Sequence, residues 1–260
     1  MTITDKDLLS MQEARNLATN AYEAQKIWGK ATQEQVDRVC AAMADAAFSA
    51  SERLGRMAAE ETGFGVAEHK KLKNEFASKH VWESIKDIKT VGVINHDTAC
   101  NIYEIAWPVG VVAGLVPSTN PTSTAINKIL ISVKARNGIV LAPHPFAVKC
   151  TLEAVQIMKD AAERAGAPAG LIGVMSKISL QGTQELMGHK RIALILATGG
   201  GPMVRVAHSM GKPAYGVGPG NVPAYVDRSA DLEKAAKYIV SSKAFDFSTI
   251  CATEQAVVAD

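Results

Sequence analysis

One cysteine of the chain lies among residues that suit covalent catalysis. Cys251 belongs to the segment Phe245-Asp-Phe-Ser-Thr-Ile-Cys-Ala-Thr-Glu254, in which its immediate neighbours are β-branched or small. A thiolate is a good nucleophile and forms thioesters readily. If a helix begins near Cys251, the helix dipole would favour the thiolate form. A buried, inert cysteine on a helix is the alternative interpretation, and the segment alone leaves both open.

Three further loops follow apolar runs and have residues that suit an anionic ligand. Pro117-Ser-Thr-Asn-Pro121 offers backbone amides and the Asn120 amide at the start of an expected helix. Ala142-Pro-His-Pro145 directs His144 outward, and Ala197-Thr-Gly-Gly-Gly201 permits close approach to a phosphate. The same residue types serve as caps and turns, and the glycines match neither standard phosphate-binding motif. A ligand-binding role and a structural role therefore both stay open for each loop.

An alternation of strands and helices from residue 90 onward must position these loops. Short strands are expected at 91–94 and 102–107, and the later apolar runs predict strands at 109–116, 138–142, 171–175 and 192–197. Helices are expected at 122–136, 147–165 and 202–210. This order predicts an α/β fold, a Rossmann-like open parallel sheet with helices on both faces. A strand at 222–226 and a helix at 232–242 are expected to continue it. Ligands of such sheets bind at the carboxyl ends of the strands, where the loops lie.

The first 86 residues read as helices. Thr32 is expected to cap a helix whose inner face carries five apolar residues: Val36, Val39, Cys40, Met43 and Ala47. A later helix is expected from Glu68 to Lys86. Its many lysines are mixed with glutamates, which predicts a solvated face rather than a binding patch.

Composition excludes several classes of partner. The 260 residues include 28 Lys plus Arg and 26 Asp plus Glu, a net charge of +2, so neither nucleic acid nor a membrane surface is the expected partner. No run approaches the roughly 18 apolar residues of a membrane helix. Four cysteines lack the paired spacing of a zinc site, so no metal is expected. Free thiols of this kind indicate a cytoplasmic protein.

Several segments, in order, resemble the aldehyde dehydrogenase superfamily. They are residues 108–126, 142–145, 195–201, 211–221 and 250–255, together with the helical start. The resemblance is strongest to the CoA-acylating branch, which includes the aldehyde half of bifunctional aldehyde–alcohol dehydrogenases. It implies the coenzyme-binding domain of that family, NAD as cofactor and coenzyme A as co-substrate.

The resemblance also assigns roles to residues. Cys251 matches the nucleophile, and Asn120 matches the residue whose amide, with the Cys251 backbone N–H, stabilises the oxyanion. The residues implied in cofactor binding are Leu115, Val116, Pro117, Ser118, Thr119, Asn120, His144, Pro145, Gly200 and Gly218.

The implied reaction is oxidation of a short aldehyde to an acyl-CoA through a Cys251 thioester. Acetaldehyde, propionaldehyde and sulfoacetaldehyde remain open as substrates. Gly216 stands where hydrolytic members of the superfamily have the glutamate that activates water. Without that base water is a poor acyl acceptor, whereas a thiol needs less activation, so CoA is favoured. A hydrolytic enzyme with another base and a catalytically incompetent nucleotide-binding fragment are the alternatives.

Four parts are expected along the chain. Residues 1–88 are the helical part of the coenzyme domain, 89–107 an oligomerisation hairpin, 108–244 the NAD-binding part, and 245–260 the start of a catalytic domain. The hairpin implies a homo-oligomer, since its exposed strand edge pairs with another subunit in the family. Family members are much longer than 260 residues, so we expect a second catalytic lobe in the parent protein and little turnover from residues 1–260 alone.

Overall fold

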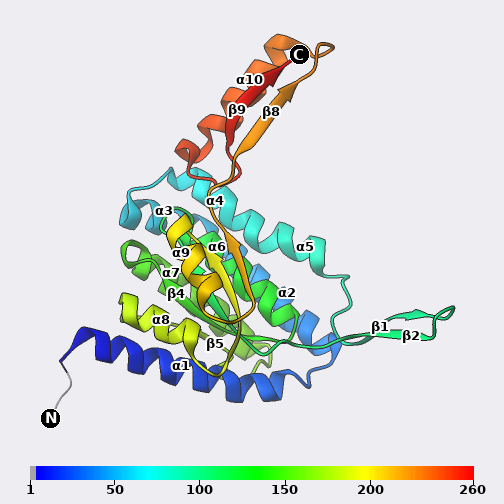
Figure 1. The fold of residues 1–260 in the computed structure, drawn as a ribbon, viewed down its shortest axis with the longest axis vertical. Coiled ribbons are helices and arrows are strands. Elements are labelled where there is room, and N and C mark those ends of the chain that lie inside the picture. The colour runs from blue at the N-terminus through cyan, green and yellow to red at the C-terminus, as the bar shows by residue number, and fades with distance from the viewer. Residues whose placement is uncertain (1–3) are drawn as a thin grey trace.

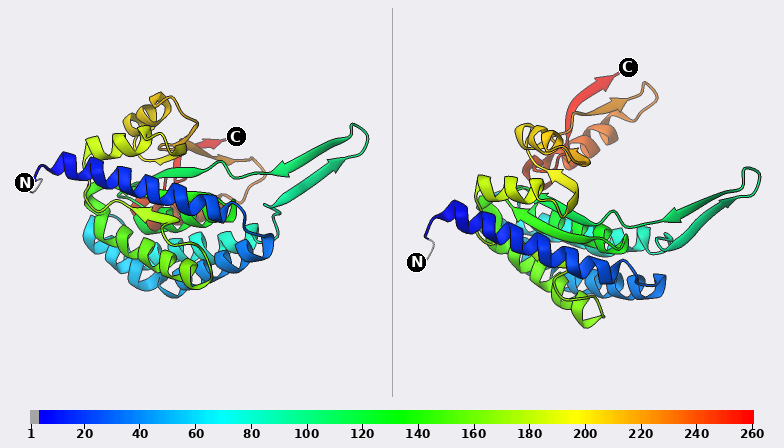
Figure 2. Two further views of the ribbon diagram at one scale, coloured as in Figure 1. Left: turned by 90° about the horizontal axis from the view of Figure 1, so that it is seen from below. Right: turned by 60° about the horizontal axis from the view of Figure 1, so that its bottom comes forward.

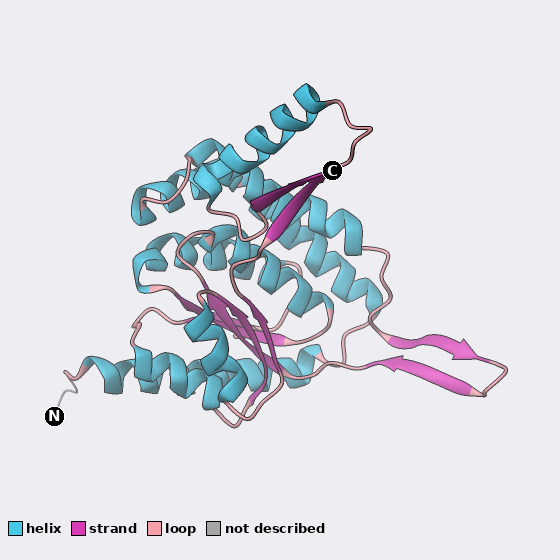
Figure 3. Cartoon of the chain, turned by 45° about the horizontal axis from the view of Figure 1, so that its top comes forward, coloured by secondary structure: helices cyan, strands magenta, loops and turns pink. Residues whose placement is uncertain are grey.

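A five-stranded parallel sheet forms the centre of the computed structural model, which describes residues 4–260 (Figure 3). Its strand order is β5-β4-β3-β6-β7, and every neighbouring pair is parallel. The strands are β3 (Val111–Val116), β4 (Gly138–Pro143), β5 (Ile172–Val174), β6 (Ile192–Thr198) and β7 (Ala214–Val217). The predicted open parallel sheet is confirmed. The chain leaves β3 toward β4 and β5 and then returns to the other side of β3, so the order reverses between β3 and β6.

Helices cover both faces of this sheet because successive strand residues point to opposite sides (Figure 2). Val111, Ala113 and Leu115 of β3 pack into one apolar cluster, whereas Val112 and Val116 belong to another. The first face is covered by α1 (Lys6–Trp28), α8 (Leu180–Gly188) and α9 (Gly201–Ser209), and the second by α2 (Gln33–Ser49), α6 (Pro121–Lys134) and α7 (Val148–Arg164). Helix α8 and strand β7 are short elements that the sequence did not predict.

The N-terminal helices follow the expected pattern. Thr32 and Gln35 form a reciprocal capping box at the start of α2, and the five predicted inner-face residues are fully buried. The helix expected over 68–86 is present as α4 (Ala67–Glu75), a π-helical turn η1 (Phe76–His80) and α5 (Val81–Ile85), preceded by α3 (Ser51–Thr62). Within residues 4–260, no helix combines the length and apolar character that a membrane span requires.

Strands β1 (Gly92–Asp97) and β2 (Ile102–Ala106) form an antiparallel hairpin that extends away from the body of the protein (Figures 1 and 2). Both short strands were predicted. The hairpin exposes large apolar side chains, among them Val93, Ile94, Ile102, Tyr103 and Ile105.

The C-terminal part does not continue the central sheet, and that expectation is wrong. β8 (Val222–Val226) pairs with β9 (Glu254–Ala259) in a separate two-stranded parallel sheet. Between them lie α10 (Leu232–Ala244) and the short turn η3 (Phe245–Ser248), and Figure 1 shows this unit above α4. An apolar run predicts a strand but not its partner. A central strand donates hydrogen bonds to neighbours on both sides, and Pro223 has no backbone N–H to donate, so this strand suits an edge position.

One buried lysine makes the stability of the fold depend on pH. Lys128 of α6 donates to the carbonyl oxygens of Leu115 and Leu196 at 2.5 and 2.6 Å, and burial lowers its pKa from 10.5 to about 7. The unfolded chain binds this proton up to pH 10.5, so between pH 7 and 10.5 it holds more protons than the folded chain. The free energy of unfolding should therefore rise with pH above 7, by up to about 1.4 kcal/mol per pH unit.

Guanidinium chloride unfolding at pH 7 and pH 9 measures this dependence. Lys128→Met keeps the apolar stem of the side chain and removes the titrating group, and it should lose the rise that Lys128 causes. Other ionisable groups are common to both proteins, so the difference between the two slopes isolates Lys128. Equal slopes would show that Lys128 stays protonated in the fold.

Candidate active site

A cavity of about 780 Å³ opens at the carboxyl ends of the parallel strands. Its walls include residues that follow β3, β4, β6 and β7, together with residues 248–251. The strand order reverses between β3 and β6, and loops on the two sides of such a reversal diverge and leave a crevice. The cavity therefore lies where an open α/β sheet binds its ligand.

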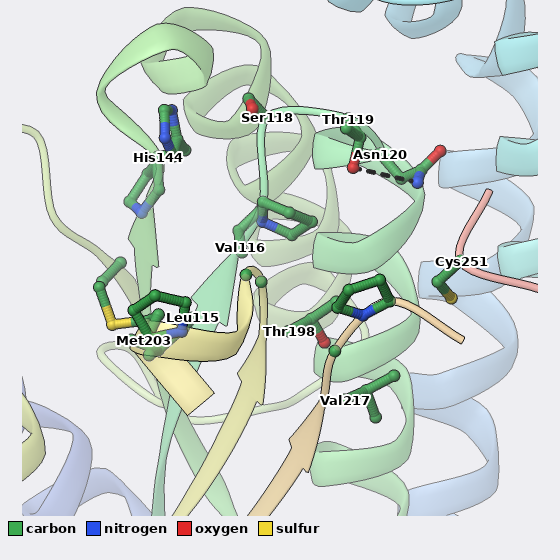
Figure 4. Close-up of a pocket in the computed structure, with 18 of the residues that line it drawn as sticks. Leu115, Val116, Ser118, Thr119, Asn120, His144, Thr198, Met203, Val217 and Cys251 are labelled. Atoms are coloured by element: carbon green, nitrogen blue, oxygen red, sulfur yellow. Dashed lines mark hydrogen bonds between the residues drawn. The ribbon is translucent and has the colours of Figure 1, made fainter. Parts of the chain in front are cut away.

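All the site residues predicted from the sequence line this one cavity (Figure 4). They come from the end of β3 and the loop after it, the turn after β4, the glycine loop after β6, the loop after β7, and the segment before β9: Leu115, Val116, Pro117, Ser118, Thr119, Asn120, His144, Pro145, Gly200, Gly218 and Cys251. In Figure 4 Asn120 lies on the same side of the cavity as Cys251, and His144 lies on the opposite side.

Cys251 is exposed to solvent in a turn between η3 and β9. No helix begins at this residue, so the condition for a helix dipole to act on its thiol is not met. The next regular element is a strand, because the small and β-branched residues after Cys251 pair with β8 instead of coiling. The thiol is accessible from the cavity, as a nucleophile requires.

The Asn120 amide is held between two segments at the N-terminus of α6. Its Oδ1 accepts from Lys73 Nζ at 2.6 Å, and its Nδ2 donates to the Thr249 carbonyl oxygen at 2.8 Å. The second contact of Nδ2, to the Thr119 hydroxyl, is long at 3.3 Å. One amide N–H is therefore fixed beside the Cys251 segment, and the other is available to a ligand oxygen.

His144 follows β4 and lines the cavity. Its Nδ1 accepts from the Phe146 backbone N–H at 3.2 Å, which leaves the proton of the neutral ring on Nε2. Burial lowers the pKa of His144 below its ordinary 6.5. His144 is therefore a neutral hydrogen-bonding group at neutral pH.

The cavity carries no carboxylate: among the residues described, neither aspartate nor glutamate lines it. Gly216, where hydrolytic relatives were expected to carry a glutamate, lies in β7 with its backbone against α9. A Cβ there would approach Val204 Cγ1 to 2.3 Å and His208 Nε2 to 2.8 Å. A larger side chain at position 216 does not fit this packing.

Sequence reasoning missed the close approach of Gly220 to the Cys251 backbone. The Gly220 N–H donates to the Cys251 carbonyl oxygen at 3.1 Å, and a Cβ at Gly220 would lie 2.5 Å from that oxygen. Only glycine allows this approach. Gly220 belongs to a glycine-rich run of the sequence, which indicates a close backbone approach. The run does not indicate that the approaching segment is the one that carries Cys251.

Sequence reasoning also missed two charged residues beside the site. Lys70 and Lys73 of α4 were expected on a solvated face, yet both are largely buried and pair with the buried Asp246. The expectation of a solvated face is therefore wrong for this pair. Helical spacing could not reveal the error, because it is the same whether a lysine faces water or a buried carboxylate. Asp246 lies four residues after the expected helix 232–242, and no local pattern there signals its pairing with α4.

The fold and the site together define a doubly wound α/β domain with an accessible cysteine in the crevice at its strand ends. The sequence model of the aldehyde dehydrogenase family matches residues 2–260, and the chain belongs to that family. The bifunctional aldehyde-alcohol dehydrogenase AdhE of Escherichia coli is 46% identical over 249 residues, which are 96% of this chain and 28% of that protein.

Two solved structures are similar over nearly all of the chain. A crystal structure of an acetylating aldehyde dehydrogenase from Geobacillus thermoglucosidasius has 56% identity and a TM-score of 0.96, covering 99% of this chain and 57% of that one. The Rhodopseudomonas palustris propionaldehyde dehydrogenase with bound CoA and an acylated cysteine has 31% identity and a TM-score of 0.84, covering 95% and 56%. This chain thus spans about half the length of these two structures.

The four cysteines should react differently with iodoacetamide. Cys100, in the turn of the β1–β2 hairpin, and Cys251 are exposed, whereas Cys40 and Cys150 are buried with pKa values raised by burial to about 12. We expect alkylation of the first pair only, and NAD⁺ should slow alkylation of Cys251 several-fold. Cys100 is the internal control. Peptide mass spectrometry gives both rates, and equal protection of Cys100 and Cys251 would contradict a nucleotide site at Cys251.

Proposed function

We propose that the protein oxidises a short aldehyde to an acyl-CoA with NAD⁺, through a thioester on Cys251. The observation that carries this proposal is the exposed Cys251 thiol in the same crevice as Asn120, among described lining residues that include no carboxylate. The family supports it, as does the propionaldehyde dehydrogenase whose cysteine is acylated and which binds CoA.

The crevice fits a dinucleotide. A Cβ at Gly200 would have its nearest contact at 3.8 Å, from Pro202, so the glycine backbone after β6 stands free to approach a phosphate. Leu115 to Asn120, His144, Pro145, Gly200 and Gly218 would hold the cofactor along the strand ends. NAD⁺, when bound, supplies the hydride acceptor.

Cys251 and Asn120 would have different roles in the reaction. The Cys251 thiolate adds to the aldehyde carbon, and the carbonyl electron pair moves to oxygen, where Asn120 Nδ2 and the Cys251 N–H stabilise the charge. Collapse of this oxyanion expels the hydrogen with its electron pair and leaves a thioester on Cys251. The sulfur of CoA, after loss of its proton, adds to the thioester carbon, and the Cys251 thiolate leaves.

The remaining features fit this activity. The exposed apolar side chains of β1 and β2 support a homo-oligomer formed through the hairpin. Residues 1–88 and 108–244 would form the coenzyme domain, and 245–260 the start of a catalytic domain. Four cysteines without a disulfide suit the cytoplasm.

Product analysis with and without CoA tests the proposed function. With acetaldehyde, propionaldehyde or sulfoacetaldehyde and NAD⁺, we expect acyl-CoA and NADH when CoA is present, and at most one equivalent of NADH per site without it. Sustained release of free acid without CoA would identify a hydrolytic enzyme. Nucleotide binding with no NADH under either condition would identify a binding fragment without turnover.

A further inference from the structure

A buried cluster of charges joins α4 to the segment before Cys251, and the reaction steps above do not use it. Asp246, fully buried, accepts from Lys70 Nζ at 3.3 Å and also from Lys73 Nζ. The Asp246 carboxylate further accepts from the Val66 N–H at 2.7 Å and the Thr249 hydroxyl at 2.5 Å. We call these three residues, Lys70, Lys73 and Asp246, the ion cluster.

Burial alone would disfavour every charge in the ion cluster. It lowers the pKa of Lys70 and of Lys73, although Asp246 acts against this change in both. Burial also acts to raise the pKa of Asp246, yet the hydrogen bonds from Lys73, Thr249 and Val66 hold it below its ordinary value. Asp246 is thus an ionised carboxylate surrounded by donors, and it ties α4 to the Cys251 segment.

The ion cluster determines the orientation of the Asn120 amide, that is, which end carries the oxygen and which the nitrogen. Lys73 Nζ, which is only a donor, lies 2.6 Å from one end of this amide, so that end must be the oxygen. The Thr249 carbonyl, which is only an acceptor, lies 2.8 Å from the other end, so that end must be the nitrogen. Without Lys73 the oxygen end loses its partner and the amide can rotate.

The backbone that joins the ion cluster to Cys251 is strained. Asp246, Phe247 and Ser248 have φ angles of 51°, 52° and 59°, a left-handed conformation that residues with a Cβ rarely adopt. Such a run persists only where surrounding contacts enforce it. The buried Asp246 carboxylate and its donors are those contacts, and Cys251 follows three residues after the run.

We propose that Lys73, held by Asp246, is a positioning residue that orients the Asn120 amide and the Cys251 segment toward a common ligand oxygen. This inference rests on the proposed function, because it assigns Asn120 to the oxyanion. Lys73 does not touch the substrate; it acts through Asn120 and through the loop.

A double-mutant cycle tests whether Lys73 acts through Asn120. We expect Lys73→Met to lower kcat about 30-fold in the otherwise unchanged protein and less than 3-fold in an Asn120→Ala background, with the KM for NAD⁺ within 2-fold. Lys73→Arg, which can still donate to Oδ1, should recover part of the loss. The same factor in both backgrounds would show that Lys73 does not act through Asn120.

Lys134→Met is the control for loss of a buried lysine from an ion pair. The Lys134 side chain is 4% exposed, against 12% for Lys73, and it pairs with Asp37 at 2.5 Å, away from the cavity. Lys134→Met should leave kcat unchanged. If the kcat of Lys73→Met were no lower than that of Lys134→Met, the inference would be overturned.

A readout independent of turnover is the alkylation of Cys251. Lys73→Met should change the rate of iodoacetamide labelling of Cys251 by about 3-fold or more, with Cys100 unchanged, because the segment that carries the thiol loses one of its two lysine contacts. An unchanged Cys251 rate would contradict the placing of this segment by Lys73. Failure of the inference and of the proposed function are distinguishable. If Cys251→Ala is inactive while Lys73→Met is fully active, only the inference fails, whereas an active Cys251→Ala protein overturns the proposed function.

Discussion

Replacing Cys251 with alanine is expected to lower acyl-CoA formation by at least about 1,000-fold, because the thioester route requires a sulfur at this position. Cys251 is exposed in the crevice. Nucleotide binding should persist in the variant, since the strand-end loops that line most of the cavity are unchanged. NADH formation in the presence of aldehyde and CoA measures the loss, and NADH fluorescence measures the binding.

Cys100→Ala is the control for this substitution. Cys100 is the other exposed cysteine, and it lies in the hairpin turn outside the cavity. It should retain full acyl-CoA formation. A Cys251→Ala protein that formed acyl-CoA at the unmodified rate would exclude the covalent mechanism.

Gly220→Ala is expected to lower kcat about 100-fold through the backbone alone. The added Cβ would lie 2.5 Å from the Cys251 carbonyl oxygen, so the Cys251 segment must move away from residue 220. Misplacement of a reacting group by about 1 Å can cost about 100-fold in rate. The overpacking should also lower the free energy of unfolding by about 1–3 kcal/mol. Steady-state kinetics and denaturant unfolding measure the two effects.

Gly188→Ala is a matched control, because it adds the same methyl group outside the cavity. Its Cβ would meet only the flexible end of Met210, with Cε at 3.3 Å, and it lies in α8, where alanine is favourable. We expect kcat within 2-fold of the unmodified protein. If Gly220→Ala were equally active, the close approach to Cys251 would have no role in placing the nucleophile.

Local patterns predicted most of the coenzyme fold, because they depend on residues close together in the sequence. Continuous apolar runs predicted β3 and β4, and Thr32 marked the start of α2. The strand-to-helix order then predicted the parallel sheet, and the rule that ligands bind at strand ends brought Asn120, His144 and Gly200 into one cavity. Short elements such as α8 and β7 carry too few residues to show a period.

The errors all concern partners distant in the sequence. The run at 222–226 was correctly predicted as a strand but was given the wrong sheet, since β8 pairs with a strand some 30 residues later. The sequence left open whether a helix begins near Cys251, and pairing of the following residues with β8 makes the next element a strand.

The sequence by itself determined the sheet, the helices, the family resemblance and the residue types that meet at the strand ends. Only the tertiary structure decided what holds the nucleophile segment. Lys73 and Asp246 are 173 residues apart, and their pairing depends on α4 and η3 being brought together by the whole fold. A lysine has the same place in a helical pattern whether it faces water or a buried carboxylate, so its role becomes visible only when its surroundings are known.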